Sequence, residues 1–174
     1  MQNISLSNNH EQHGQKKQNQ TLNNHKSILK QLSPDKKFKL IGEIASLMIS
    51  SDLHIDYKLK DIRDIFMPAV DKNQFRIYHN KQGLPVGFLC WAFLSDEVDK
   101  LYSQGNYKLQ PQDWNSGGNG WIIELIAPFG HGKDIIAELR NKIFPDRVGK
   151  AFVFSKDKKK LKVINIRGSK VKMH

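Results

Sequence analysis

The chain has 174 residues, a formal net charge of +11 and one cysteine. This length favours one domain, and a single cysteine excludes an internal disulfide framework. No apolar run approaches the ~20 residues that a membrane-spanning helix needs, and the N-terminus lacks the apolar segment of a secretory signal. We therefore expect a cytoplasmic protein with no membrane span.

The positive charge lies at the two ends of the chain. Residues 1–37 carry a net +4 and residues 156–174 a net +7, whereas the 14 basic and 14 acidic side chains of residues 38–155 cancel. Basic ends attract acidic partners, namely nucleic acid, an anionic membrane or an acidic protein. The basic residues are not interleaved with aromatic ones and no nucleic-acid recognition motif is present. A non-enzymatic nucleic-acid-binding protein is therefore the alternative and not the main hypothesis.

Residues 1–32 form the first segment in chain order. They hold six Asn, six Gln and three His, and their few apolar residues show no helical period. This composition is typical of a disordered tail, and a single domain is expected over 33–174. Ser33 and Pro34 suit an N-cap and the first helical position, and together with the apolar spacing that follows they predict a helix over 34–50.

The rest of the chain alternates between helix and strand signals. A second helix begins near Leu59 and is expected to stop near Pro68, because helical geometry is disfavoured before a proline. Apolar periodicity and turn residues then predict the remaining elements: strands at 74–79 and 84–94 that form a hairpin, a short helix at 95–102, a strand at 121–126, a helix at 133–143, and strands at 151–155 and 161–167. This order predicts an α/β (α+β) fold, a mixed sheet with helices packed on it.

Three side chains in these elements are candidates for chemistry. Glu124 lies in the middle of an apolar strand, and a buried carboxylate needs a partner or a function. The alternatives for it are a solvated face or an ion pair with an arginine such as Arg140. His54 follows the end of the first helix, where a histidine is commonly a cap or a surface residue. Cys90 lies in an apolar run, which favours a core position over a nucleophile.

A tight glycine turn, Gly130-His131-Gly132, connects the strand at 121–126 to the next helix. A strand, a Gly-x-Gly turn and a helix N-terminus can form an anion cradle from backbone N–H groups, although such turns often serve packing alone. The turn resembles the acyl-donor loop of the GCN5-related N-acetyltransferase fold. In that loop a Gln or Arg occupies the position of Ala127, and its absence here counts against ordinary acetyl-CoA binding.

A second resemblance covers residues from about 40 to 146, and more loosely to about 170. Asp113 to Gly117, Trp121 and Ile126 to Gly130 are similar to motifs of the RTX toxin-activating lysine acyltransferases, the hemolysin-activating C proteins. Further matches occur in the same order as in that family: Ser50-Ser51-x-Leu53-His54, Pro68-Ala69, Pro85-Val86, Trp91-Ala92 and Phe144-Pro145-Asp146. Several Trp, Pro and Gly matches at fixed spacing are more specific than one short motif.

The resemblance implies a GCN5-related N-acetyltransferase-like fold and the transfer of a fatty acyl group from acyl carrier protein to internal lysines of an RTX protoxin. It implies a homodimer and a phosphopantetheine thioester as donor. We expect no permanently bound cofactor, no metal and no nucleic acid. An acetyl-CoA-dependent acetyltransferase is the alternative enzyme. By the family's motifs, the catalytic histidine falls on His54 and the catalytic aspartate on Glu124. The expected substrate-binding residues are Ser51, Trp121, Gly130, His131 and Gly132.

The expected chemistry begins with a protonated lysine, from which a histidine can take a proton as the amine attacks the thioester. Glu124 would orient the imidazole and stabilise its charged form, and an acyl-histidine intermediate is an alternative route. Backbone N–H groups near Gly130 are candidate oxyanion donors. The basic run Lys158, Lys159 and Lys160 is a candidate docking face for the acidic carrier protein, or else a solvated turn.

Overall fold

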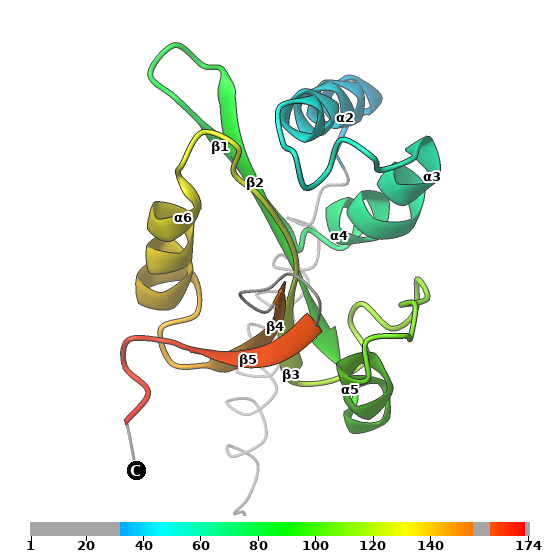
Figure 1. The fold of residues 1–174 in the computed structure, drawn as a ribbon, viewed down its shortest axis with the longest axis vertical. Coiled ribbons are helices and arrows are strands. Elements are labelled where there is room, and N and C mark those ends of the chain that lie inside the picture. Colours follow the sequence, from blue (N-terminus) through cyan, green and yellow to red (C-terminus); the bar gives the residue numbers. More distant parts are fainter. Residues whose placement is uncertain (1–31, 155–160, 173–174) are drawn as a thin grey trace, which may run out of the picture. The chain divides into compact units, whose positions relative to one another are not determined.

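The computed structural model describes residues 32–154 and 161–172 (Figure 1). Residues Pro34–His174 cluster as one unit and Met1–Ser33 as another. The predicted N-terminal tail, apart from its last residue, and the basic run Lys158 to Lys160 lie outside the described residues. None of the helices in the described part of the chain has the length and apolar character needed to cross a membrane.

A five-stranded mixed sheet runs through the second unit. Its strands lie side by side in chain order, β1-β2-β3-β4-β5. Neighbouring strands are antiparallel except β3 and β4, which are parallel. The strands are β1 (Phe75–His79), β2 (Pro85–Leu94), β3 (Asn119–Ile126), β4 (Val148–Phe154) and β5 (Leu161–Arg167).

Helices precede, connect and flank these strands. They are α2 (Pro34–Ile49), α3 (Leu59–Asp61), η1 (Ile62–Phe66), α4 (Met67–Asp71), α5 (Asp96–Ser103), α6 (Gly132–Glu138) and η2 (Leu139–Ile143). η1 and η2 are π-helical turns that continue α3 and α6. The α6–η2 segment supplies the crossover that two parallel strands require. The observed order confirms the predicted succession of helices and strands and the predicted α/β mixed sheet.

The prediction that the second helix stops near Pro68 is wrong. Helical structure continues through α4 to Asp71. Pro68 lies in the first turn of α4, directly after the π-helical turn η1. At this position the helix changes from π-helical to α-helical hydrogen bonding. Prolines and π-bulges are both sites where the regular helical ladder is interrupted, so the segment stays helical although Pro68 has no N–H.

One extra residue in β3 determines which side chains share a face of the sheet. Cys90 lies opposite Glu124, and the next residue of β2 lies opposite Ile122, so Ile123 is the additional residue. Side chains of a strand alternate between the two faces, and a bulge shifts that alternation by one position. As a result, Glu124 and Trp121, three positions apart, lie on the same face of the sheet.

The two faces of the sheet hold different cores. On one face Leu89 packs against Ile135 and Leu139 of the α6–η2 segment. On the other face Phe88 meets Phe66 of η1 edge-on, with ring centroids 5.5 Å apart. Figure 1 shows α6 on one side of β2 and α2 to α4 on the other. The acid of β3 shares its face with Phe88, so it points towards the side of α2 to α4.

Candidate functional site

His54 lies in a short turn that follows α2. The backbone N–H groups of His54 and Ile55 donate to the carbonyl of Ser51 at 2.9 and 3.0 Å, and the N–H of Tyr57 donates to the carbonyl of His54 at 3.0 Å. These tight turns bring residues spaced three apart to the same side of the segment. His54 is only 4% exposed, so it is neither a surface residue nor a solvated cap.

The imidazole of His54 contacts the carboxylate of Glu124. Its Nε2 lies 3.1 Å from Oε1 of Glu124, although the two residues are 70 positions apart in the chain. The carboxylate is largely withdrawn from solvent, with 16% of the side chain exposed. The alternative of a pair with Arg140 is wrong, because Nε of Arg140 donates to the carbonyl of Arg167 at 2.8 Å.

Two further side chains extend this contact into a hydrogen-bonded chain. Oγ of Ser51 lies 2.7 Å from Nδ1 of His54, and the hydroxyl of Tyr57 donates to Oε2 of Glu124 at 2.9 Å. An ionised carboxylate only accepts hydrogen bonds, so Nε2 of a neutral imidazole carries the proton and Nδ1 accepts from the Ser51 hydroxyl. A hydroxyl, a base and an acid thus stand in series, an arrangement in which the carboxylate fixes the histidine tautomer.

Tyr57 is the member of this chain that the sequence did not predict. Its ring also lies edge-on against the imidazole, with centroids 5.1 Å apart. Burial and the neighbouring Glu124 carboxylate raise the pKa of Tyr57 above its usual range, so the phenol stays a neutral donor at physiological pH. The spacing Ser51-x-x-His54-x-x-Tyr57 is the signal that could have found it, because three-residue turns align such positions.

Cys90 lies opposite Glu124 in the sheet and is fully buried. Burial, followed by the Glu124 carboxylate, raises the pKa of its thiol. A thiol that is protonated and inaccessible is a poor nucleophile. This confirms the predicted core position of Cys90. In the described ranges, no three His, Cys, Asp or Glu side chains are grouped so that they could hold a metal ion.

A cavity of about 350 Å³ opens beside the His54–Glu124 pair. Of the four linked side chains, Tyr57 and Glu124 line it, together with residues such as Tyr102 and Trp114. A molecule that enters this cavity therefore meets the carboxylate and the phenol before the imidazole.

Trp121, a predicted substrate-binding residue, is part of the core and is 1% exposed. Its Nε1 donates to Oδ1 of Asp99 at 2.7 Å, and Nζ of Lys150 bonds the same carboxylate. The ring meets Tyr102 edge-on, with centroids 4.8 Å apart. The indole N–H thus already has a partner, and a substrate-binding role for Trp121 stays a prediction.

The Gly130-His131-Gly132 turn borders a cavity other than the one beside the His54–Glu124 pair. Gly130 has a φ of 89°, which glycine adopts without strain. His131 directly precedes α6 and lines a separate cavity of about 180 Å³ with Tyr78 and Glu138. The structure therefore brings Ser51, but not His131, into contact with the catalytic candidates. Substrate or oxyanion binding by this turn stays a prediction.

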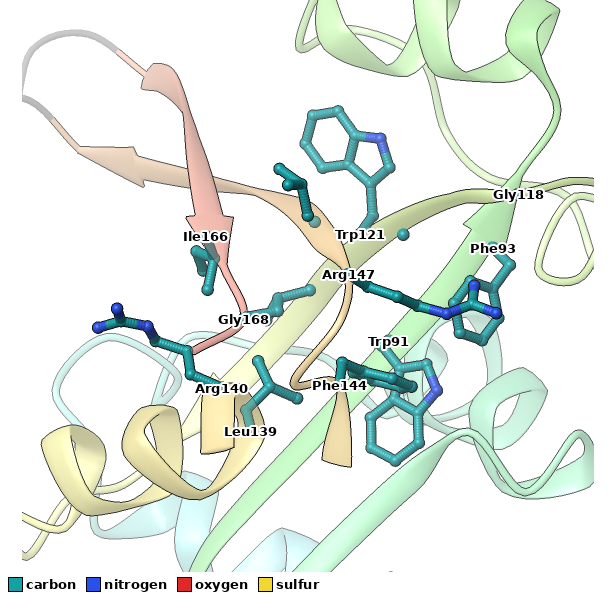
Figure 2. Close-up of a pocket in the computed structure, with 14 residues that line it drawn as sticks. Trp91, Phe93, Gly118, Trp121, Leu139, Arg140, Phe144, Arg147, Ile166 and Gly168 are labelled. Carbon is teal, nitrogen blue, oxygen red and sulfur yellow. The ribbon is translucent and has the colours of Figure 1, made fainter. Parts of the chain in front are cut away.

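Another cavity, of about 140 Å³, lies between η2 and the sheet (Figure 2). Trp91, Phe93 and Phe144 line it, and the guanidinium of Arg147 lies 5.3 Å from the centroid of the Phe93 ring. Figure 2 shows the Arg147 side chain extended along that ring. Neither member of the histidine–glutamate pair lines this cavity, so it is separate from the site.

Comparison with known proteins gives this site its chemical context. Residues 33–167 match the model of the RTX toxin acyltransferase family. The chain belongs to this family. It is 40% identical over 124 residues to the uncharacterized protein sll0720 of Synechocystis sp., which covers 71% of this chain and 84% of that protein. Membership in the RTX toxin acyltransferase family confirms the resemblance seen in the motifs.

Two further relatives have names that describe an activity. The chain is 36% identical over 106 residues to the lysine-acyltransferase RtxC of Vibrio cholerae, covering 61% of this chain and 69% of that protein. It is 30% identical over 135 residues to the leukotoxin-activating lysine-acyltransferase LktC serotype A1 of Mannheimia haemolytica, covering 77% and 80%. In an RTX toxin acyltransferase, a buried histidine held by a carboxylate beside a cavity is a candidate acyl-transfer site.

Proposed function

We propose that this protein is a protein-lysine fatty acyltransferase that transfers an acyl group from acyl carrier protein to internal lysines of an RTX protoxin. The observation that carries the proposal is the 3.1 Å contact between Nε2 of His54 and Oε1 of Glu124, in a chain of the RTX toxin acyltransferase family. The names of the lysine-acyltransferase relatives support lysine as the acceptor. We further propose that the reaction takes place in the cytoplasm and that the enzyme is a homodimer.

The reaction needs a base because the acceptor lysine, with a pKa of about 10.4, arrives as an ammonium. Transfer of one proton to His54 gives a neutral amine, and Glu124 stabilises the resulting imidazolium. The amine attacks the thioester carbonyl, the C–N bond forms and the C–S bond breaks. The second amine proton ends on the departing sulfur. The imidazolium then releases its proton to water, so the products are the amide, the thiol and one proton.

The hydrogen-bonded chain defines where that proton enters. With Nε2 donating to Glu124, the lone pair of the neutral ring belongs to Nδ1, which faces the Ser51 hydroxyl at 2.7 Å. There are therefore two routes to Nδ1: the Ser51 hydroxyl relays the proton from the amine, or the amine displaces that hydroxyl and contacts Nδ1 directly. An acyl group carried on the histidine is the alternative route.

The sheet supports entry of the donor next to Glu124. β3 and β4 pair over Gly120–Ile122 and Gly149–Ala151, and β3 runs on to Ile126. Glu124 lies beyond the last of these pairs. An extended chain can hydrogen-bond to the edge of a strand, so a pantetheine arm entering between β3 and β4 would bring its thioester to the carboxylate.

The proposal is tested by intact-mass analysis of an RTX protoxin co-expressed with the protein. We expect fatty acyl mass increments with the wild type and none with His54→Ala. The matched control is His79→Ala, because Nε2 of His79 makes a similar contact of 3.0 Å with Oε1 of Glu43 in an exposed position. Acylation of the protoxin by the His54→Ala variant would show that His54 is not the base of the reaction.

Purified protein then decides between the donors. Transfer from fatty acyl carrier protein supports the proposal, whereas transfer from acetyl-CoA alone supports the acetyltransferase. DNA binding that weakens with salt, without acyl transfer from either donor, supports the nucleic-acid-binding alternative.

A further inference from the structure

The cavity of about 140 Å³ between η2 and the sheet lies across the sheet from the proposed reaction site (Figure 2). Trp91, which lines it, packs in one cluster with Leu139 of η2. Ile122 lies opposite Trp91 in the sheet and shares its face, whereas Glu124 points to the other face. A group bound in this cavity therefore does not touch the His54–Glu124 pair, and the cavity needs a role other than the reaction itself.

Glycines keep this cavity open on the side of β3 and β4, where Gly118, Gly120 and Gly149 line it. Packing explains Gly149, because a Cβ there would lie 3.3 Å from the carbonyl oxygen of Gly120. Gly118 and Gly120 do not have a positive φ. A Cβ on Gly118 would meet nothing within 4 Å, and one on Gly120 would lie 3.7 Å from the Phe93 ring, an ordinary contact. Glycine weakens a strand and is often found where a ligand approaches the backbone, so what Gly120 preserves is space for a ligand.

Aromatic rings form the apolar wall of the cavity. Trp91 and Phe93 each meet Phe144 edge-on, with ring centroids 5.3 and 5.7 Å apart. The guanidinium of Arg147 lies 5.3 Å from the centroid of the Phe93 ring, so the place of a cation over this ring is already taken. The wall therefore favours an apolar or aromatic group, to which the rings offer contact area and edge-to-face geometry.

The surroundings of the cavity are basic. Segments 139–154 and 161–172, which supply η2, β4 and β5, carry eight basic side chains and one acid, Asp146. Arg140 and Arg147 line the cavity and are exposed. Neither guanidinium pairs with a carboxylate of the described residues. Both can therefore bind the carboxylates of a ligand, for which the guanidinium has a matching geometry.

We propose that this cavity is a docking site for an acidic peptide segment of a partner protein. One aromatic or branched apolar side chain enters the cavity, and flanking carboxylates bind Arg140 and Arg147. Figure 2 shows the two arginine side chains extending to opposite sides of the cavity, which suits acids on both sides of one apolar anchor. Residues 1–31 of the chain do not complement this charge, because they contain four Lys and one Glu. The inference goes beyond the proposed function and does not depend on it.

The test is an NMR titration of the isotopically labelled full-length protein with the peptide acetyl-Glu-Asp-Phe-Asp-Glu-amide. We expect saturable shifts of the amide signals of Gly118, Gly120 and Gly149, which line the cavity. The peptide with Ala in place of Phe should bind at least about tenfold more weakly, because it has no side chain to bury. The peptide with Lys in place of its four acids should not shift these signals. Failure of the Phe peptide to bind at millimolar concentration would overturn the inference.

A variant that fills the cavity separates peptide binding from folding. Valine favours strands, and the first added carbon at Gly120 has room. We therefore expect Gly120→Val to melt no lower than the wild type and to bind the peptide at least about tenfold more weakly. Gly120→Ala, which fills less space, should lie between the two and serves if the larger side chain prevents folding. Wild-type affinity in both variants would show that the cavity does not hold the anchor.

An arginine variant tests the charge. Arg147→Gln should weaken peptide binding roughly two- to fivefold, the effect of losing one exposed ion pair. The matched control is Arg76→Gln, because Arg76 is an exposed arginine that lies opposite Leu89, on the same face of the sheet, and does not line the cavity. Equal losses in the two variants would show only a general attraction to positive charge and would overturn the inference.

Other occupants of the cavity would give different results. A short oligothymidylate that shifts the three glycine signals, when the acidic peptide does not, would assign the cavity to nucleic acid. Shifts without peptide that depend on protein concentration would assign it to a second copy of the chain. Shifts caused by deletion of residues 1–31 would assign it to the N-terminal segment. Each of these three results would overturn the inference.

Discussion

Replacing Glu124 with glutamine separates the charge of this side chain from its shape. The hydroxyl of Tyr57 can still donate to the amide oxygen, as it does to Oε2 of the carboxylate. The amide nitrogen then takes the position of Oε1, which lies 3.1 Å from Nε2 of His54. Because an amide NH₂ only donates, Nε2 must accept, and the ring proton moves to Nδ1. Glu124→Gln therefore leaves Ser51 facing the wrong tautomer and removes the charge that stabilises the imidazolium.

The expected loss in kcat is about 10²–10⁴-fold, which corresponds to about 2.7–5.4 kcal/mol of transition-state stabilisation. The assay is a single-turnover time course of lysine acylation, followed by intact mass at saturating donor. Glu43→Gln is the matched control, because Glu43 makes the second histidine contact of this kind at 3.0 Å. A Glu124→Gln rate within threefold of the wild type, or an equal loss in Glu43→Gln, would refute the role of the carboxylate.

Three further predictions concern Tyr57, Cys90 and the basic run Lys158 to Lys160. Tyr57→Phe should lower kcat about tenfold and shift the pH–rate profile, because a hydrogen bond to a charged group contributes roughly 1.5 kcal/mol. A profile that does not shift would show that Tyr57 contributes only packing to the site. Native Cys90 should resist iodoacetamide at pH 8 and react fully in denaturant. Rapid labelling of the native protein would contradict the burial of this thiol. Because burial raises the thiol pKa of Cys90, the contribution of the neutral thiol to stability is present at neutral pH and is lost as the pH rises above the ordinary thiol range. Reversal of Lys158, Lys159 and Lys160 to Glu should raise the KM for acyl carrier protein, and an unchanged KM would reject the docking face.

The sequence predicted those features that depend on local pattern. Apolar spacing and turn residues located the elements, and the family's motifs singled out His54 and Glu124 from opposite parts of the chain. Their contact depends on how β2 and β3 pair, which is a long-range property. The same holds for Tyr57, whose phenol matters only because β3 brings a carboxylate to it. Pro68 misled the prediction because a proline can lie within a helix where the hydrogen-bond pattern changes, and the sequence does not show the π-helical turn η1 that precedes it.

The motif could not predict the direction in which Glu124 points. A regular strand would place Trp121 and Glu124 on opposite faces, since their spacing is odd. The extra residue Ile123 puts both side chains on the side of α2 to α4, where His54 lies in the turn after α2. The site therefore depends on a register shift that hydrophobic periodicity does not reveal.

Deletion of Ile123 tests that dependence directly. Removal of the additional residue restores regular alternation, so one half of β3 must turn its side chains to the other face. Either Glu124 leaves His54 and enters the apolar core around Leu89, or Trp121 loses its buried place. We expect lost acyl transfer and a lower melting temperature, measured by intact mass and circular dichroism. Deletion of Lys81 in the exposed β1–β2 turn is the control for chain shortening. An Ile123 deletion that keeps wild-type acylation would show that the bulge does not position the carboxylate.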